Sequence, residues 1–274
     1  FTDQSFSDDE TRKYFFGNKK EGKYLSGDSR GWSLTTARNK IKENNHLMTI
    51  KEIDYRPFDT RYIYYSPNMV DWGREKFMQN FFIGKNLGLA LCKQFKTGDN
   101  YYHVFISNKI FESSYVSNRT SEITSTFPLY LYPQTNAQRT IDQTTERTPN
   151  LNAEIVKQIA EKLELTFTNE KEITEGTFAP IDLLDYIYAV LHSPTYREKY
   201  KEFLKIDFPR VPYPKDVATF WQLVKLGGEI RQIHLLESPT VEQYITQYPI
   251  DGTNEVVKPK YENGKVYINE TQYF

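Results

Sequence analysis

The spacing of apolar residues changes near residue 150 of this 274-residue chain. Before that point, short runs rich in aromatic and β-branched residues predict strands at 49–55, 61–66, 86–93, 101–107 and 127–132. After it, Leu151, Ile155, Ile159 and Leu163 recur with the period of an amphipathic helix. The pattern predicts an α+β fold, with a mixed or antiparallel sheet and short helices in the N-terminal part and a mainly helical C-terminal part.

Local signals predict further helices and one hairpin. The helices are expected at 33–43, 73–82, 180–192, 196–205 and 215–236. In the short helix at 73–82, Phe77 and Phe81 can face the core. Gly227 and Gly228 would let the last helix pack closely against a neighbour. Asn263 and Gly264 suit the type I′ turn of a hairpin at 261–268.

Composition divides the chain into four parts. Residues 1–30 are polar and glycine-rich, and we expect a lead-in segment or loop there. Residues 31–133 hold the predicted sheet and short helices. Residues 134–149 have almost no bulky apolar groups, which indicates a polar linker or loop. Residues 150–274 form the mainly helical scaffold part with its terminal hairpin.

Composition also excludes several classes of protein. No apolar run approaches the roughly 18 residues of a membrane helix, so no membrane partner is expected. The acidic, polar N-terminus is unlike a signal peptide. The single cysteine, Cys92, lies in an apolar run, which favours a buried thiol in a reducing cytoplasm. Because the first residue is not Met, we expect the chain to be part of a longer protein.

The charge is unevenly distributed, although the net charge is −1. Residues 30–119 carry 14 Lys and Arg against 8 Asp and Glu, whereas residues 150–274 carry 14 against 19. A mildly basic N-terminal half is compatible with a surface that faces DNA.

Sequence blocks along most of the chain carry a family resemblance. PFDTRYIYY at 57–65 and WGREKFMQN at 72–80 resemble the target-recognition region of type ISP restriction–modification enzymes and related adenine-N6 DNA methyltransferases. Later blocks are similar to that family in order and spacing, among them NLGLALCKQ at 86–94, SNRTSEITSTFPLYLYP at 117–133 and FWQLVKLGGEIRQIHLLESP at 220–239. In the family this region follows the methyltransferase domain and selects the DNA sequence, and it does not itself catalyse a reaction.

The resemblance implies a function and a set of partners. We expect a sequence-specific domain that binds double-stranded DNA and positions a target adenine for N6 methylation. The methyltransferase domain of the same polypeptide would use S-adenosylmethionine and flip the base out of the helix. The alternative is a non-catalytic interaction module that docks partner domains through an aromatic-rich face.

Catalytic motifs are missing from the sequence. The chain has no Pro-Pro pair for a (D/N/S)PP(Y/F) motif and no FxGxG turn for the methyl donor. Residues 17–23 match the start of a P-loop, but Tyr24 replaces the required Ser or Thr. The four histidines are scattered, which favours packing over metal ligation. We therefore expect no catalytic residue, metal ligand or cofactor in this fragment.

Candidate DNA-contacting side chains cluster between residues 56 and 121. Arg, Gln and Asn can bond two atoms of one base edge, and Lys suits phosphates. Asp59 can instead pair with an arginine and fix a turn, which is the favoured interpretation for that carboxylate. The candidates on strand ends, the short helix and one loop are Arg56, Arg61, Arg74, Lys76, Gln79, Asn80, Lys93, Gln94, Lys96, Ser107, Asn108, Asn118, Arg119, Thr120 and Ser121.

Overall fold

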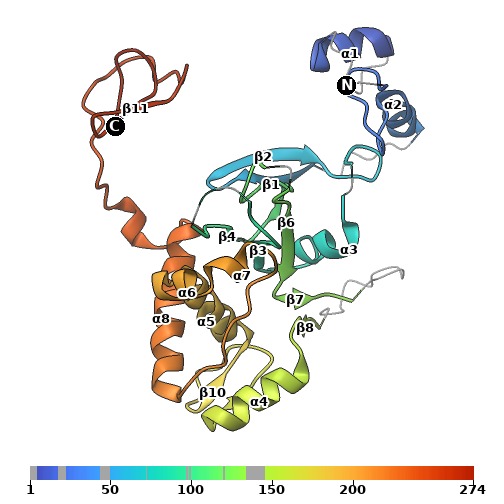
Figure 1. Ribbon diagram of the computed structural model, residues 1–274. Helices are drawn as coiled ribbons and strands as arrows, with labels where there is room; N and C mark the ends of the chain where they lie inside the picture. The colour runs from blue at the N-terminus through green and yellow to red at the C-terminus, as the bar shows by residue number, and fades with distance from the viewer. Residues whose placement is uncertain are drawn as a thin grey trace. The chain divides into compact units, whose positions relative to one another are not determined.

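The computed structural model confirms the α+β fold, and Figure 1 shows its elements. It describes residues 5–17, 23–43, 50–71, 73–96, 98, 100–119, 121–133 and 146–274. Its contacts divide the chain into two units, Phe1–Arg231 and Gln232–Phe274. The expected linker at 134–149 lies largely outside the described residues, so the four-part division of the chain stays a prediction.

Two small sheets form the centre of the N-terminal part. One has the order β2-β1-β5, with β1 antiparallel to β2 and parallel to β5. The other has the order β4-β3-β6 and is antiparallel throughout, with its strands side by side in Figure 1. The strands are β1 Ile50–Arg56, β2 Asp59–Tyr64, β3 Gly88–Cys92, β4 Val104–Ser107, β5 Ile110–Phe111, β6 Thr124–Pro128, β7 Tyr130–Leu131, β8 Thr148–Pro149, β9 Thr166–Phe167, β10 Thr177–Phe178, β11 Lys260–Glu262 and β12 Lys265–Tyr267.

The helices follow most of the expected positions. They are α1 Asp8–Phe16, α2 Leu34–Glu43, α3 Glu75–Met78, α4 Ala153–Leu163, α5 Pro180–His192, α6 Pro194–Lys199, α7 Lys201–Leu204 and α8 Val217–His234, with the 3₁₀ turns η1 Gln79–Phe81 and η2 Pro239–Glu242. None of the helices in the described part of the chain is long and apolar enough to cross a membrane.

Within the expected lead-in segment or loop at 1–30, the structure contains a helix that the sequence analysis did not predict, α1. Ser7 begins the helix with a capping box: its Oγ accepts from the Glu10 amide at 3.2 Å, and the Glu10 carboxylate accepts from the Ser7 amide at 2.8 Å. Arg12 on α1 then pairs with Asp28 at 2.6 Å, and both side chains are largely buried. Polar contacts therefore help to fold this segment.

The central strand β3 is buried at every position, and two features explain it. The strand has a neighbour on each side, since Gly88 pairs with Ser107 of β4 and with Pro128 of β6. Gly88 also packs against the ring of Phe81, where a Cβ atom would lie 2.5 Å from Cζ. The 3₁₀ turn η1 is therefore held directly on the sheet.

In the helical part, α5 and α8 cross at very short range. A Cβ atom on Gly227 of α8 would lie 1.8 Å from the carbonyl oxygen of Asp185 on α5, so a glycine is required there. Arg231 bonds the Asp185 carboxylate with two nitrogens, at 2.6 and 3.1 Å. The expectation of close packing at Gly227 is confirmed.

The strand pair β7–β8 connects the sheets to the helical part. The Asn86 side chain donates to the carbonyl of Tyr130 at 2.8 Å. The Tyr130 hydroxyl donates to the carbonyl of Asn169 at 3.1 Å. Arg147 donates to the carbonyl of Lys85 at 2.7 Å and to Glu170 at 2.6 Å, and it stacks on Tyr130. These contacts cross the chain segment that the sequence marks as a linker.

The unit Gln232–Phe274 contains the predicted hairpin, β11–β12. Asn263 and Gly264 take the positive φ angles of 52° and 78° that a type I′ turn requires. Gln272 is the buried residue of this unit, and it donates to the carbonyl of Ile250 and accepts from the amide of Asn254. Polar contacts rather than an apolar core organise this unit.

Candidate nucleic-acid interface

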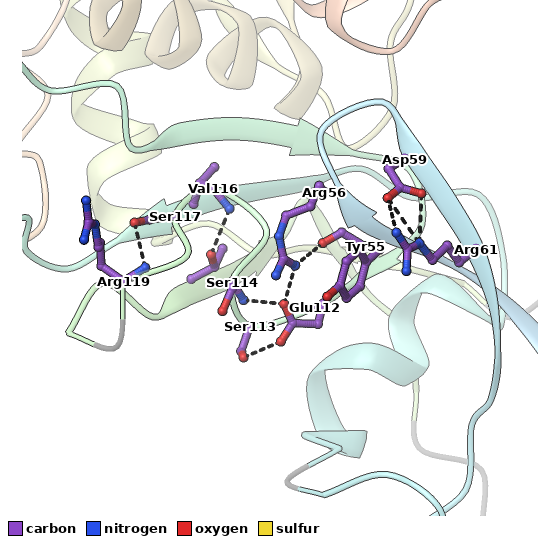
Figure 2. Close-up of polar contacts among 11 residues, drawn as sticks. Tyr55, Arg56, Asp59, Arg61, Glu112, Ser113, Ser114, Val116, Ser117 and Arg119 are labelled. Carbon is purple, nitrogen blue, oxygen red and sulfur yellow. Dashed lines mark hydrogen bonds and ion pairs between the residues drawn. The ribbon is translucent and has the colours of Figure 1, made fainter. Parts of the chain in front are cut away.

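An open cavity of about 590 Å³ lies where several predicted DNA-contacting loops meet. It is lined from the end of β1, from the segment before β4 and from the loop that precedes β6. Figure 2 shows the polar contacts on this side of the molecule. The lining residues are Arg56, Pro57, Gly98, Asn100, Tyr102, His103, Ser114, Tyr115, Val116, Ser117, Asn118, Arg119 and Glu122.

Arg56 is held at the cavity by partners on both sides. The parallel pairing of β1 with β5 brings Glu112 close, and its carboxylate bonds Arg56 Nη1 at 2.6 Å (Figure 2). The guanidinium carbon lies 4.0 Å from the centre of the Tyr55 ring. Burial alone would raise the pKa of Glu112, but hydrogen bonds from Ser113 and Ser114 and pairing with Arg56 lower it overall. Arg56 is therefore oriented before any ligand arrives.

Arg61 stacks on the same tyrosine and is paired with Asp59. The guanidinium of Arg61 bonds both Asp59 oxygens, at 3.0 and 2.7 Å, and lies 3.9 Å from the centre of the Tyr55 ring. The hydrogen bond from Arg61 is the main reason that the pKa of Asp59 is lowered. The favoured interpretation of Asp59 as the partner of an arginine at a turn is confirmed.

A buried carboxylate holds the floor of the cavity together. Glu122 is 1% exposed, and its side chain accepts from the Lys96 amide at 2.8 Å and from the Ser117 hydroxyl. His103 Nε2 lies 2.9 Å from the same carboxylate, and the imidazole stacks on Phe95. Glu122 thereby ties the segment after β3, the segment before β4 and the 117–122 loop into one structure.

The histidine and cysteine expectations can be compared with this geometry. His103 is a packing residue, as its position in a segment typical of a half-buried strand suggests. Cys92 is buried, which also agrees with its expected role, and burial raises the pKa of its thiol to about 12. Within the described ranges, no group of three or more His, Cys, Asp or Glu side chains could hold a metal ion.

Several candidates meet at the cavity. Asn118 and Arg119 are exposed on its rim, and the hydrogen bond described for Arg119 uses its backbone amide rather than its guanidinium (Figure 2). Gln94 donates to the carbonyl of Ser121 at 3.5 Å, which places the segment after β3 beside this loop. Lys93 and Lys96, also exposed, belong to that segment. Thr120 lies outside the described residues.

Two candidates are wrong, because their side chains are buried and fully engaged. Asn80 is 2% exposed; it donates to the carbonyl of Phe77 at 2.9 Å and accepts from the amide of Tyr132 at 2.8 Å. Ser107 is 0% exposed and donates to Asp54 at 2.6 Å. Neither side chain can reach a base or a phosphate. Both instead connect secondary structure elements.

The remaining candidates lie away from the cavity lining. Arg74 and Lys76 are exposed at the start of α3, and Gln79 is half-buried in η1. Gln79 donates to the carbonyl of Lys76 at 3.3 Å. Asn108 is exposed in the turn between β4 and β5. Their contact with DNA stays a prediction.

This side of the molecule also contains residues that the sequence did not single out. Glu112 bonds the Arg56 guanidinium, Glu122 bonds the backbone amide of Lys96, and Asn100 and Tyr102 line the cavity. Tyr102 carries a usable signal: its neighbours Tyr101 and His103 are buried, so the alternation of an extended segment turns Tyr102 outward. The role of the two glutamates depends on contacts distant in sequence, which no local pattern gives.

Solved structures with a similar fold come from much longer chains. The ATP-dependent type ISP restriction–modification enzyme LlaBIII bound to DNA matches with a TM-score of 0.61 and 20% identity, over 88% of this chain and 15% of that one. The DrdV–DNA complex matches with a TM-score of 0.54 and 23% identity, over 76% of this chain and 18% of that one. A nuclease-deletion mutant of the type ISP enzyme LlaGI, in complex with a DNA substrate mimic, matches with a TM-score of 0.50 and 22% identity, over 82% of this chain and 18% of that one.

The family assignment comes from the sequence as a whole. No curated protein sequence matches the chain. The model of the type ISP C-terminal specificity domain, in contrast, matches residues 3–274, which is nearly the whole chain. The resemblance seen in the sequence blocks is confirmed, and the chain belongs to the type ISP C-terminal specificity domain family.

Proposed function

We propose that this chain is a sequence-specific DNA target-recognition domain of a restriction–modification methyltransferase. It binds double-stranded DNA and positions a target adenine for N6 methylation by a separate catalytic domain of the same polypeptide. The observation that carries the proposal is the match of residues 3–274 to a specificity domain family. The similar solved structures of LlaBIII and DrdV are DNA complexes, which supports the choice of ligand.

The chemistry of the cavity supports the same proposal. Arg56, Asn118 and Arg119 all line the cavity, and guanidinium and amide groups are the side-chain types that bond the edges of guanine and adenine. Lys93 and Lys96, on the neighbouring segment, are exposed point charges that suit phosphates. Base-reading and phosphate-binding groups thus lie close together.

Catalysis belongs to the separate domain in this proposal. S-adenosylmethionine would bind there, because the present chain lacks the donor-binding and base-holding motifs. The chain described here would contribute affinity and sequence choice alone. The protein would act in the cytoplasm.

Selection of DNA by the full-length protein tests the proposal. The protein is mixed with a library of random duplexes, and the bound DNA is sequenced before and after substitution. Arg119→Ala should relax the preference at one base pair by about 1–3 kcal/mol. Lys96→Ala should weaken binding to every sequence alike and reduce the salt slope by about one phosphate contact.

A control and a contrary outcome complete this experiment. Lys157→Ala removes another exposed charge, on α4, and should change neither preference nor salt slope. If the wild-type protein enriches no sequence, target recognition by this chain is refuted, and an interaction module that docks protein partners becomes the better explanation.

A further inference from the structure

The cavity has a feature that phosphate binding does not explain, namely an exposed aromatic wall. Tyr102 is 66% exposed, although it lies between Tyr101 and His103, which are 2% and 9% exposed. It also lines a second cavity of about 290 Å³, together with Asn100 and Arg197. Tyr102 therefore borders two cavities and exposes much of its side chain.

The ring is supported from the helical part. The guanidinium carbon of Arg197 on α6 lies 5.3 Å from the centre of the Tyr102 ring. Arg197 is itself fixed, because its Nε donates to the carbonyl of Leu191 at 2.6 Å. The buried flanking residues anchor the backbone on both sides of Tyr102. Such a ring is pre-oriented for stacking, and little conformational entropy is lost when it binds.

We propose that the larger cavity holds a single unstacked nucleobase of the bound DNA, with Tyr102 as its stacking surface. The inference deepens the proposed function and rests on it. A cavity of about 590 Å³ falls within the range of roughly 300–1,000 Å³ that is usual for small-ligand pockets. An aromatic face beside guanidinium and amide groups is the combination that binds single bases.

The other lining groups fit a base edge. Arg119, Asn118 and Asn100 are exposed hydrogen-bonding residues that line the same cavity as Tyr102. Glu122 is the acidic residue among the described lining residues, and its carboxylate is 1% exposed and bonded from within the protein. It therefore does not face the ligand with an open negative charge. A phosphate would bind through the cationic groups alone, whereas a base would also stack on the Tyr102 ring.

An abasic scan of the recognition site tests this inference in the full-length protein. After the preferred duplex has been selected, each nucleotide in turn is replaced by an abasic analogue that keeps the sugar and the phosphate. Tyr102→Ala should weaken binding to the intact duplex about 10-fold, which corresponds to about 1.4 kcal/mol. Tyr102→Phe keeps the ring and should retain the wild-type affinity.

The abasic duplexes separate a base from a phosphate. At one position, removal of the base should weaken wild-type binding and abolish the further effect of Tyr102→Ala, because the stacked partner is gone. Tyr213→Ala, which removes a partly exposed tyrosine from the helical part, is the matched control and should bind like the wild type.

Three results would overturn the inference. Tyr102→Ala with unchanged affinity would show that the ring contacts no base. An effect of equal size on every abasic duplex would assign the cavity to a phosphate or to the fold. An equal loss for Tyr102→Phe would assign the effect to the hydroxyl. In each case, a wild-type protein that still selects its sequence leaves the proposed function intact, so the two failures are distinguishable.

Discussion

Replacing Glu122 with Gln is the sharpest test of how the cavity is held together. The substitution preserves the shape of the side chain but exchanges one acceptor oxygen for an amide donor. In the wild-type protein one carboxylate oxygen accepts from the Lys96 amide at 2.8 Å. The other oxygen lies 2.9 Å from His103 Nε2 and accepts from Ser117.

Either orientation of the new amide leaves a buried donor without a partner. If the oxygen of the substituted side chain faces His103, its NH₂ group faces the Lys96 amide, and that N–H loses its acceptor. If the oxygen faces Lys96, His103 must accept at Nε2 and carry its proton on Nδ1, which is buried and has no partner among the described residues. An unpaired buried donor costs about 1–3 kcal/mol, so Glu122→Gln should destabilise the fold by about 2 kcal/mol.

Thermal unfolding and amide exchange measure this effect. For a chain of this size, a loss of about 2 kcal/mol lowers Tm by about 4–8 °C. Glu154→Gln, an exposed substitution on α4, is the control and should stay within about 0.5 kcal/mol of the wild type. Amide exchange at Lys96 should also accelerate in Glu122→Gln. A variant with wild-type Tm and unchanged exchange at Lys96 would refute the argument.

Three further predictions concern other residues. Asn80→Ala should destabilise the fold by about 1–3 kcal/mol in urea unfolding yet leave the selected DNA sequence unchanged; an altered preference would restore Asn80 as a base contact. Gly227→Ala places a methyl group 1.8 Å from the Asp185 carbonyl oxygen and should cost about 1–3 kcal/mol or more, so near-neutral unfolding would contradict the close α5–α8 crossing. Because the pKa of Glu112 is lowered in the folded state, its stabilising effect is present above the ordinary value of about 4.3 and is lost as the pH falls through the folded value. The stability difference between wild type and Glu112→Gln should therefore shrink between about pH 7 and about pH 3, and a constant difference would exclude this linkage.

Local sequence signals predicted most of the elements correctly. The Asn263-Gly264 pair predicted a hairpin because a type I′ turn needs a positive φ angle at two consecutive residues, and few residue pairs other than Asn-Gly adopt it readily. Gly227 in a long apolar helix predicted close packing for a similarly local reason. Helix α1 was missed because its segment is polar, although Ser7 and Glu10 formed a recognisable capping box. The capping box thus indicated the start of a helix, but the polar composition of the segment led to the prediction of a loop.

The site was harder to predict because burial depends on distant partners. Asn80 has the amide of a base reader, and only its contact with Tyr132, 52 residues later, shows that it is structural. Arg56 was expected at the interface, but its orientation depends on Glu112, 56 residues away. A sequence therefore identifies side chains with the right chemistry, and the fold decides which of them are accessible.

The contacts around β7 and β8 determine how specificity can be transplanted between relatives. A chimera joined inside 134–149 would take Lys85 and Tyr130 from one parent and Glu170 from the other, although Arg147 touches all three. Exchanging the N-terminal part alone would thus leave Arg147 beside unmatched partners in the junction. Grafts that carry residues 85–170 from one parent keep these contacts, and chimeric domains should be built on that rule.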